Sequence, residues 1–496
     1  MRRVAGLAFA LCLIVLTAAH IGSPDVLFDG DAGPYAVRVI VRPPEVVPGL
    51  AEVIVRVNAT DANRVSIRPV FWRAGVRGAP SADVLSTMPG QSQLYAGRLW
   101  LMAYGAYSVY VTVDGARGAG TVIVPVNSFA TGRLPLSRGL GAILVVLGVL
   151  LFAGLLTIVR AGAGESLVAP GETMDAARRR RANVVTGVAA AVLAVALLGG
   201  AKWWGAEDAA YRGHMFGSPK AEATFSVDSS HRTLQLRLSD TARFRAIYSP
   251  VAPDHGKMMH LFLVSSSGIQ TFAHLHPVET DSLVFTTQVP SVPAGRYLLF
   301  GDIVLENGLS LTVTNRVEIP PAPGAVTPSD SDDTWDRTAS VTQIDSGAVR
   351  LLGDGYSMAW AGSEGPITSG EPIDLRFVVR DSSGAVAPVH PYLGMAAHAV
   401  VIDHDGSVFI HLHPMGTVSM AAQRVFAMRD RGDTTQSGRL RTQELLAGEA
   451  PTMSNMPMSG ELTFPYEFPK PGHYRIWVQA KPANRVLTGT FDVDVR

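Results

Sequence analysis

Cysteine is nearly absent from this chain of 496 residues, which contains only Cys12. That residue lies in an N-terminal apolar run, so the folded domains can form neither an intramolecular disulfide nor a thiolate metal site. Blue-copper and multicopper oxidases are excluded for the same reason, because they need a cysteine ligand. The formal net charge is zero and no basic stripe with interleaved aromatic residues occurs, which gives no support for nucleic acid as a partner. A Gly-x-Ser-x-Gly nucleophile motif is also missing.

Turn-forming residues are abundant, with 49 glycines and 32 prolines. This composition and the length predict three or four domains built from many short strands. Residues 35–127 contain β-rich runs separated by Pro-Gly and Asp-Gly turns, which predict an antiparallel sandwich. The region contains no histidine, so we assign it no metal site. Its role is contact with a partner or spacing.

Three apolar segments predict a membrane association. Residues 1–20 are typical of a cleaved signal peptide or an uncleaved N-terminal anchor. Residues 139–159 and 184–204 are long and apolar enough to cross a bilayer. The loop between them, residues 160–183, carries the run Arg178 to Arg181 and is therefore expected in the cytoplasm. Large domains would then lie on the periplasmic or extracellular side of the cell membrane, held by an anchor without a transport path.

A histidine-bearing hairpin occurs twice in the second half of the chain. The first copy, H-L-F-L-V-S-S-S-G-I-Q-T-F-A-H-L-H-P, runs from His260 to Pro277. The second copy, H-A-V-V-I-D-H-D-G-S-V-F-I-H-L-H-P, runs from His398 to Pro414. Each has two apolar runs joined by a polar turn with glycine, and each ends in F-x-H-L-H-P. This pattern indicates a β-hairpin.

Strand geometry places the histidines of each copy on one face. Residues two apart on a strand point the same way, so His274 and His276 project together, as do His411 and His413. A three-residue turn centred on Gly268 sets His260 opposite His276, and a two-residue turn at Asp405-Gly406 sets His398 opposite His413. The other face is apolar and is expected to be core: Leu261, Leu263, Ala273, Leu275, Ala399, Val401, Ile410 and Leu412.

The two hairpins belong to a longer tandem repeat. Residues 221–320 and 337–496 each end in a Pro-rich turn, a glycine, a tyrosine and an apolar strand, and a Pro- and Asp-rich linker at 321–336 separates them. We therefore predict a mostly β protein. It has three immunoglobulin-like β-sandwiches outside the membrane, the last two a repeat, and two or three transmembrane helices.

Several stretches resemble a known family. They are A-G-S-E-G-P-I-T-S-G-E-P-I-D-L-R-F-V-V-R-D-S-S-G (361–384), P-Y-L-G-M-A-A-H (391–398), F-I-H-L-H-P-M-G (409–416) and the Pro-Gly-His-Tyr ending. The chain is similar in these to extracytoplasmic β-sandwich proteins of the YtkA-like kind and, more distantly, to CopC-like copper carriers. The resemblance covers the last domain well and the preceding one in part. It implies an immunoglobulin-like fold, an envelope location and copper handling.

The residue chemistry points to a transition metal. Imidazole suits copper and zinc, and thioether sulfur selects copper(I). We predict His398, His411 and His413 as the better site, with His260, His274 and His276 as its counterpart. Met395, Met415 and His473 are weaker candidates. The predicted function is sequestration of copper, with zinc as a second possibility, or its transfer to a copper-accepting envelope protein, without enzymatic activity.

Two other interpretations stay open. The histidines could hydrogen-bond to backbone and to one another inside a sandwich, and the protein would then be a non-metal scaffold or adhesion protein of the envelope. A cupin-like metal enzyme is suggested by Gly268, His274, His276 and Glu279, but the later glycine, proline and histidine pattern of that family is missing from its expected place.

Overall fold

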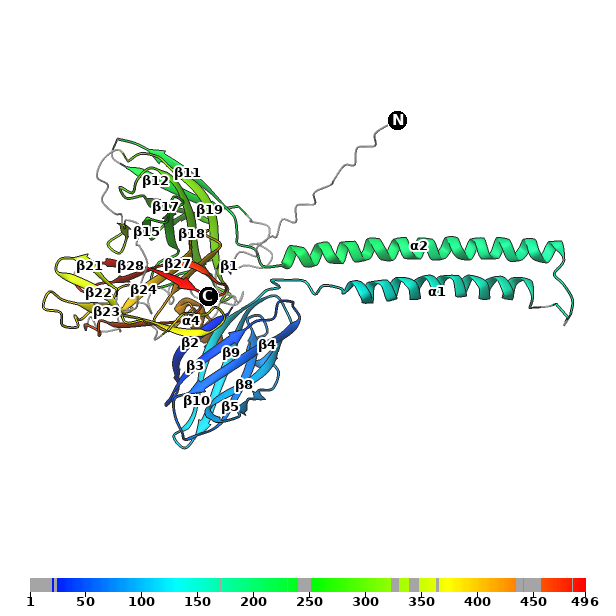
Figure 1. The fold of residues 1–496 in the computed structure, drawn as a ribbon, viewed down its shortest axis with the longest axis horizontal. Helices are drawn as coiled ribbons and strands as arrows, with labels where there is room; N and C mark the ends of the chain where they lie inside the picture. Colours follow the sequence, from blue (N-terminus) through cyan, green and yellow to red (C-terminus); the bar gives the residue numbers. More distant parts are fainter. Residues whose placement is uncertain are drawn as a thin grey trace, which may run out of the picture. The chain divides into compact units, whose positions relative to one another are not determined.

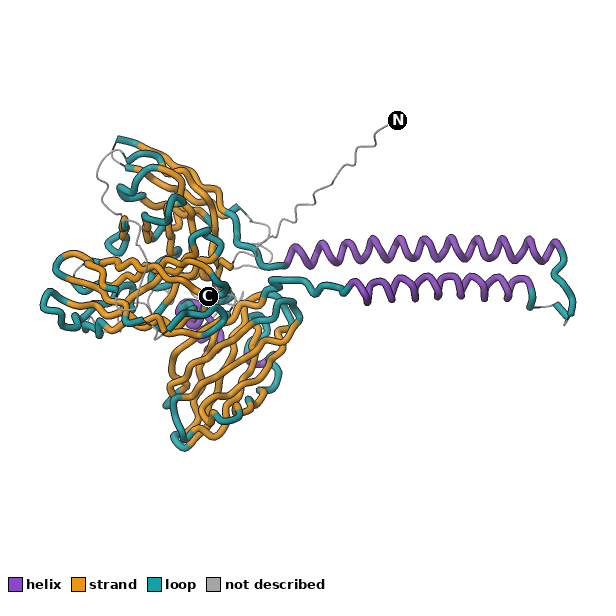
Figure 2. Tube along the Cα trace, viewed as in Figure 1, coloured by secondary structure: helices purple, strands orange, loops and turns teal. Residues whose placement is uncertain are grey.

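The computed structural model describes residues 20–21, 25–166, 168–169, 171–229, 231–239, 251–322, 330–338, 348–362, 365–433, 440, 456–483 and 485–496. It has two compact units, one formed by the residues up to Ser128 together with Gly217–Arg496 and the other by Phe129–Phe216. The first unit is built from mostly antiparallel β-sheets and the second from two long helices (Figures 1 and 2). Cys12 and nearly all of the predicted signal or anchor, residues 1–20, lie outside the described residues.

The N-terminal part of the first unit is a pair of antiparallel sheets. Their order is β2-β3-β4-β8-β7 and β10-β9-β5-β6. The strands are β2 (Val26–Ala32), β3 (Tyr35–Arg42), β4 (Gly49–Val57), β5 (Ala62–Phe71), β6 (Asp83–Val84), β7 (Ser86–Met88), β8 (Gln91–Leu101), β9 (Gly105–Gly115) and β10 (Gly118–Ser128). Residues alternate between buried and exposed along β4, as expected for a sandwich strand. The sandwich begins at Val26, before its predicted start at residue 35.

The second pair of sheets contains the first histidine hairpin. Their order is β11-β12-β17-β16 and β13-β18-β14-β15-β20, with β19 also paired to β18. The strands are β11 (Ala221–Val227), β12 (Arg232–Leu238), β13 (Val251–Ala252), β14 (His260–Ser265), β15 (Thr271–Leu275), β16 (Val278–Asp281), β17 (Val284–Gln288), β18 (Gly295–Leu305), β19 (Ser310–Ile319) and β20 (Thr334–Arg337). The predicted linker at 321–336 is wrong at its end, because β20 forms a ladder with β15.

The third pair of sheets contains the second histidine hairpin. Their order is β1-β25-β24-β27-β28 and β21-β22-β23-β26. The strands are β1 (His20–Ile21), β21 (Val349–Gly353), β22 (Tyr356–Trp360), β23 (Pro372–Arg380), β24 (Ala397–Asp403), β25 (Val408–Leu412), β26 (Glu461–Glu467), β27 (Gly472–Ala480) and β28 (Leu487–Val495). A helix that the sequence analysis did not anticipate, α4 (Met420–Arg431), follows β25. Ser419 caps its start, and Gly432 in the left-handed conformation ends it.

The strand register of both hairpins is the predicted one. Leu261 pairs with Leu275, and Ala399 pairs with Leu412. One further step along each ladder sets His260 opposite His276 and His398 opposite His413, so each set of three histidines shares a face. The apolar residues predicted on the other face are all buried.

The histidine-bearing faces are also apolar, and they pack against each other. Phe262, Phe272 and Phe300 of the second domain join Phe409 and Trp477 of the third in one buried cluster. The Phe300 and Phe409 rings stack at 4.0 Å between centroids, and those of Phe272 and Trp477 at 4.7 Å. Burial of each large side chain contributes about 1.5–3 kcal/mol. The two hairpins are therefore buried on both faces, and their histidines lie where the two domains meet.

The second unit is a helical hairpin of α1 (Arg138–Gly164) and α2 (Ala176–His214), which run side by side in opposite directions (Figure 1). Both helices are long and apolar enough to cross a membrane, and their apolar side chains are exposed. The chain turns back where Gly164 lies against Ala182. The arginine run predicted in the connecting loop at 160–183 lies instead in the first turns of α2, after the N-cap Asp175.

Candidate metal centre

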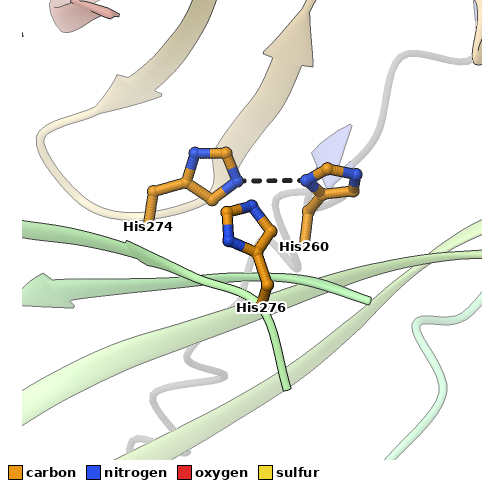
Figure 3. A group of neighbouring side chains, drawn as sticks. All are labelled: His260, His274 and His276. Atoms are coloured by element: carbon orange, nitrogen blue, oxygen red, sulfur yellow. Dashed lines mark hydrogen bonds between the residues drawn. The ribbon is translucent and has the colours of Figure 1, made fainter. Parts of the chain in front are cut away.

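Three histidines from β14, β15 and the residue after β15 form the first cluster, which we call triad 1: His260, His274 and His276. Each can offer one ring nitrogen, and these atoms lie within 4.8 Å of one another. The three rings are turned toward one another (Figure 3). All three residues are buried, with at most 3% of their surface exposed.

The second repeat builds the same arrangement, triad 2, from His398, His411 and His413. Its ligand atoms also lie within 4.8 Å of one another, and all three residues are buried. The corresponding contacts match in detail. His260 Nδ1 lies 3.1 Å from His274 Nε2, and His398 Nδ1 lies 3.1 Å from His411 Nε2.

Hydrogen-bond partners fix the protons of triad 1. His260 Nε2 lies 3.2 Å from the carbonyl oxygen of Asp254, which can only accept, so the proton is on Nε2. His274 Nδ1 donates to Gln479 Oε1 at 2.9 Å and to Tyr392 Oη at 3.1 Å, while the Tyr392 hydroxyl donates to the Asp332 carbonyl. His276 Nδ1 donates to the Asp333 carboxylate at 2.9 Å.

Triad 2 has the same proton pattern. His398 Nε2 donates to the carbonyl oxygen of Tyr392 at 3.1 Å, and His413 Nδ1 donates to that of Val418 at 3.2 Å. His411 Nδ1 faces the Asp302 carboxylate at 3.5 Å, which favours a proton there. Each triad therefore presents the same three unprotonated nitrogens, one Nδ1 and two Nε2.

These lone pairs converge without protons to join them. Within the described part of the chain, His276 Nε2 and His413 Nε2 are buried and have no hydrogen-bond partner. The 3.1 Å contact between His260 and His274, dashed in Figure 3, joins two nitrogens whose protons are engaged elsewhere. Metal-binding histidines characteristically donate their other ring N–H to a carbonyl, carboxylate or amide oxygen, which orients the lone pair toward the ion. Five of the six rings fit this pattern, and the sixth, His411, faces the Asp302 carboxylate at 3.5 Å.

Burial lowers the pKa of five triad histidines and so favours their neutral form. It lowers the pKa of His260, His274, His398 and His411 well below 6.5, and repulsion by neighbouring histidines adds to the effect. The pKa of His413 falls to about 4 for the same first reason. A proton is therefore a poor candidate for the space among the lone pairs, whereas a metal ion competes well for neutral imidazole.

The triads adjoin, and each domain supplies a partner to the other's triad. The His260 and His411 rings lie 5.3 Å apart. Asp302 pairs with His260 across β18 and reaches His411, whereas Gln479 pairs with His398 across β27 and reaches His274. The two repeats thus exchange equivalent contacts, and the cluster depends on the fit between the domains.

The N-terminal sandwich supports the loop that completes triad 2. Thr417 and Leu27 exchange hydrogen bonds of 3.0 Å, and Asp29 N donates to the Met415 carbonyl at 2.9 Å. A side chain on Gly416 would lie 2.1 Å from the Leu27 carbonyl oxygen, so glycine is required at this close approach. This loop carries Val418, the acceptor for His413.

Two of the three weaker candidates, Met415 and His473, make their contacts outside the triads. Met415 packs against the apolar core of the N-terminal sandwich, and His473 is exposed and pairs with Asp494. Met395 is buried in a turn closed by reciprocal backbone hydrogen bonds with Tyr392, and its ligand role stays a prediction. Three further methionines precede β26: Met453 lies outside the described residues, Met456 is exposed, and Met458 packs against the core of the third domain.

Sequence reasoning missed one histidine of the centre. His255 lies in the turn Asp254–Lys257, with ring centroids 5.4 Å from His398 and 5.3 Å from His413. The second repeat has Leu393 in the corresponding turn, so comparison of the repeats could not reveal the residue. Its position five residues before His260, beside Gly256, was the only available signal.

Comparisons with known proteins give a family but no activity. A family model described as a domain of unknown function (DUF8832) matches residues 221–320 and 349–496. No curated protein matches the chain. The matching family is not that of the YtkA-like or CopC-like proteins, so that resemblance remains a proposal.

Solved structures with some similarity include an engineered protein, at 20% identity over 18% of this chain and 19% of that one, with a TM-score of 0.15. Another is a tetra-tandem repeat from the extending region of a large adhesion protein, at 7% identity over 95% and 82%, with a TM-score of 0.16. Domains 1-6 of the surface layer protein SbsC match at 8% identity over 92% and 54%, with a TM-score of 0.13. Scores this low carry no structural argument. The family model spans half of the chain and both histidine-bearing repeats, and the chain belongs to this DUF8832 family.

Proposed function

We propose that this protein is a membrane-anchored envelope protein that binds two copper ions, one in each histidine triad, and stores them or passes them to an acceptor protein. The observation that carries the proposal is the set of six buried imidazole lone pairs. Each triad directs three of them inward, while the other ring nitrogens face carbonyl, carboxylate, amide or hydroxyl oxygens.

The composition of each triad favours copper(I) over zinc. Structural zinc takes four protein ligands, whereas each triad offers three imidazoles. Carboxylates lie beside both triads, Asp333 and Asp330 at His276, Asp302 at His411 and Asp254 at His413. The preference for copper(I) therefore rests on the three-imidazole ligand set and not on the local charge.

The proposed location rests on the two helices and on the resemblance. Two apolar helices of sufficient length support a membrane anchor, and the arginines at the start of α2 favour a cytoplasmic turn between them. The resemblance to YtkA-like proteins supports immunoglobulin-like sandwiches on the outer side. We treat the protein as a binding protein without catalysis, with an envelope copper acceptor as its partner.

The test is a titration of the full-length protein in detergent with copper(I), copper(II) and zinc(II), in competition with a chelator of known affinity. We expect two copper(I) ions per chain after desalting. His411→Ala with His413→Ala should leave one ion, as should His274→Ala with His276→Ala. Retention of no metal under any condition would refute the proposal and support a scaffold whose histidines are architectural. Tighter retention of zinc than of copper(I) would refute the choice of metal.

A further inference from the structure

A third group of metal-binding atoms adjoins triad 2. Asp254, His255 and His413 can each offer one ligand atom, and these atoms lie within 4.8 Å of one another. The His255 side chain is only 6% exposed, and its Nε2 lies 3.7 Å from Asp254 Oδ1, beyond hydrogen-bonding distance. Among the described residues, His255 Nε2 and His413 Nε2 are both buried without a hydrogen-bond partner. Two buried imidazole nitrogens that have no hydrogen-bond partner therefore adjoin a carboxylate.

The carboxylate of Asp254 is held in place by the protein. Ser419 Oγ donates to Oδ2 at 2.9 Å, and the backbone N–H of Ala421 donates to Oδ1 at 3.1 Å. Both donors belong to the start of α4, where the helix dipole stabilises a negative charge. Each carboxylate oxygen has more than one lone pair, so Asp254 can still contact an ion.

His413 can serve only one ion at a time. Its Nδ1 proton is bound to the Val418 carbonyl, which leaves a single lone pair on Nε2. That lone pair completes either triad 2 or the group with Asp254 and His255. The two metal positions are therefore alternatives, joined by a shared ligand.

The third group borders a space that an ion could use to reach the centre. A cavity of about 100 Å³ is lined by Asp254, Met258 and His413, and also by His260, His411 and Asp302. It has room for several water molecules, and hence for a partly hydrated ion. Met258 adds a soft sulfur ligand that favours copper(I).

We propose that Asp254, His255 and His413 form a transient metal position through which an ion enters and leaves triad 2. This inference rests on the proposed function. The ligand is a transition-metal ion that accepts imidazole and carboxylate donors, copper(I) above all. The ion meets Asp254 and His413 from the cavity, is held there with the adjoining His255, and moves to His398 and His411 without ever being free. The group beside triad 1 has a different composition, His276 with Asp330 and Asp333, because Leu393 takes the place of His255 in the corresponding turn.

The test measures the rate at which triad 2 is loaded. Full-length protein carrying His274→Ala and His276→Ala, so that triad 2 alone binds, is mixed without oxygen with a coloured bicinchoninate complex of copper(I). His255→Asn is the test variant, because asparagine tolerates the left-handed backbone at this position (φ 54°) better than most residues. We expect one ion per chain at equilibrium and a loading rate at least ten-fold lower. Leu393→Asn, at φ 50° in the matching turn, is the control and should change the rate less than two-fold.

The outcomes separate the two proposals. An unchanged rate with full occupancy in His255→Asn would overturn the transient position and leave the triads standing. A lower final occupancy would also overturn it, since His255 would then be an equilibrium ligand. Absence of binding in the unsubstituted triad 2 would overturn the proposed function itself. Thermal unfolding of each variant, with His255→Gln as a second substitution, identifies any loss of the fold.

Discussion

Replacement of His413 by leucine separates a metal ligand from a structural histidine. In the metal-free protein the substitution removes one hydrogen bond, from His413 Nδ1 to the Val418 carbonyl. It also removes a buried nitrogen, His413 Nε2, that has no partner among the described residues. The side chains are similar in volume, so the packing changes little.

The opposing free-energy terms nearly cancel. Loss of the hydrogen bond, which leaves the Val418 carbonyl buried without a donor, costs about 2–4 kcal/mol, whereas removal of the unpaired nitrogen stabilises the fold by about 1–3 kcal/mol. We therefore expect the free energy of unfolding of the metal-free variant to lie within about 2 kcal/mol of the wild-type value. An ion at 100 times its dissociation constant stabilises the fold by about 2.7 kcal/mol per site. Copper should stabilise the wild type by about 5 kcal/mol and the variant by about half of that.

The assay is urea unfolding of the full-length protein in detergent, with and without copper(I). His276→Leu is the counterpart in triad 1 and should lose copper stabilisation in the same way, but its metal-free loss should be larger, because the substitution leaves the buried Asp333 carboxylate without the His276 N–H. A metal-free loss of more than about 4 kcal/mol in His413→Leu, well above the hydrogen-bond estimate, would refute the reasoning, as would equal stabilisation of wild type and variant by copper.

Three further predictions follow from the same geometry. Asp302→Ala should weaken copper binding about 10–100-fold at triad 2 alone, and Gln479→Ala should do the same at triad 1 alone. Competition titrations measure both affinities. If each substitution instead weakened the triad of its own domain, the contacts exchanged between the two domains would not support the triads. Gly416→Ala should weaken triad 2, since its Cβ would lie 2.1 Å from a carbonyl oxygen, whereas Gly118→Ala, also at positive φ but in open space, should not. As the pH is lowered below about 6.5, the free energy of unfolding of the metal-free protein should decrease by about 1.4 kcal/mol per pH unit for each of five triad histidines. The reason is that histidines of the unfolded chain bind protons in this range, whereas the buried imidazoles do not. Asp302 contributes in the opposite direction, because burial raises its pKa to about 7, and it cancels the contribution of one histidine. Urea unfolding at pH 7.5 and 5.5 measures the net change in the free energy of unfolding.

The local structure of the hairpins could be predicted from the sequence because it depends on two short-range properties. Strand periodicity sets which residues share a face, and turn length sets the register. Both hold at His260 and His276 and at His398 and His413. The protons of these rings could not be predicted, since their acceptors include Asp333 and Gln479, which are distant in sequence.

The meeting of the two triads also lay beyond the sequence. The alternation of each strand predicts one apolar face, and Phe262, Phe272 and Phe409 were not recognised as a second one. Their burial against the other repeat depends on domain packing, which no local pattern encodes. His255 was missed for the same reason, because only the docked domains bring it beside His413.

X-ray absorption at the copper edge of the loaded full-length protein tests the central claim most directly. We predict two copper(I) ions per chain, each with three nitrogen ligands near 2.0 Å, in the range usual for imidazole bound to a metal of this size. The spectrum should also contain the scattering pattern of imidazole rings. A sulfur ligand in place of a ring nitrogen, or a sample that retains no metal after desalting, would contradict the proposed copper sites.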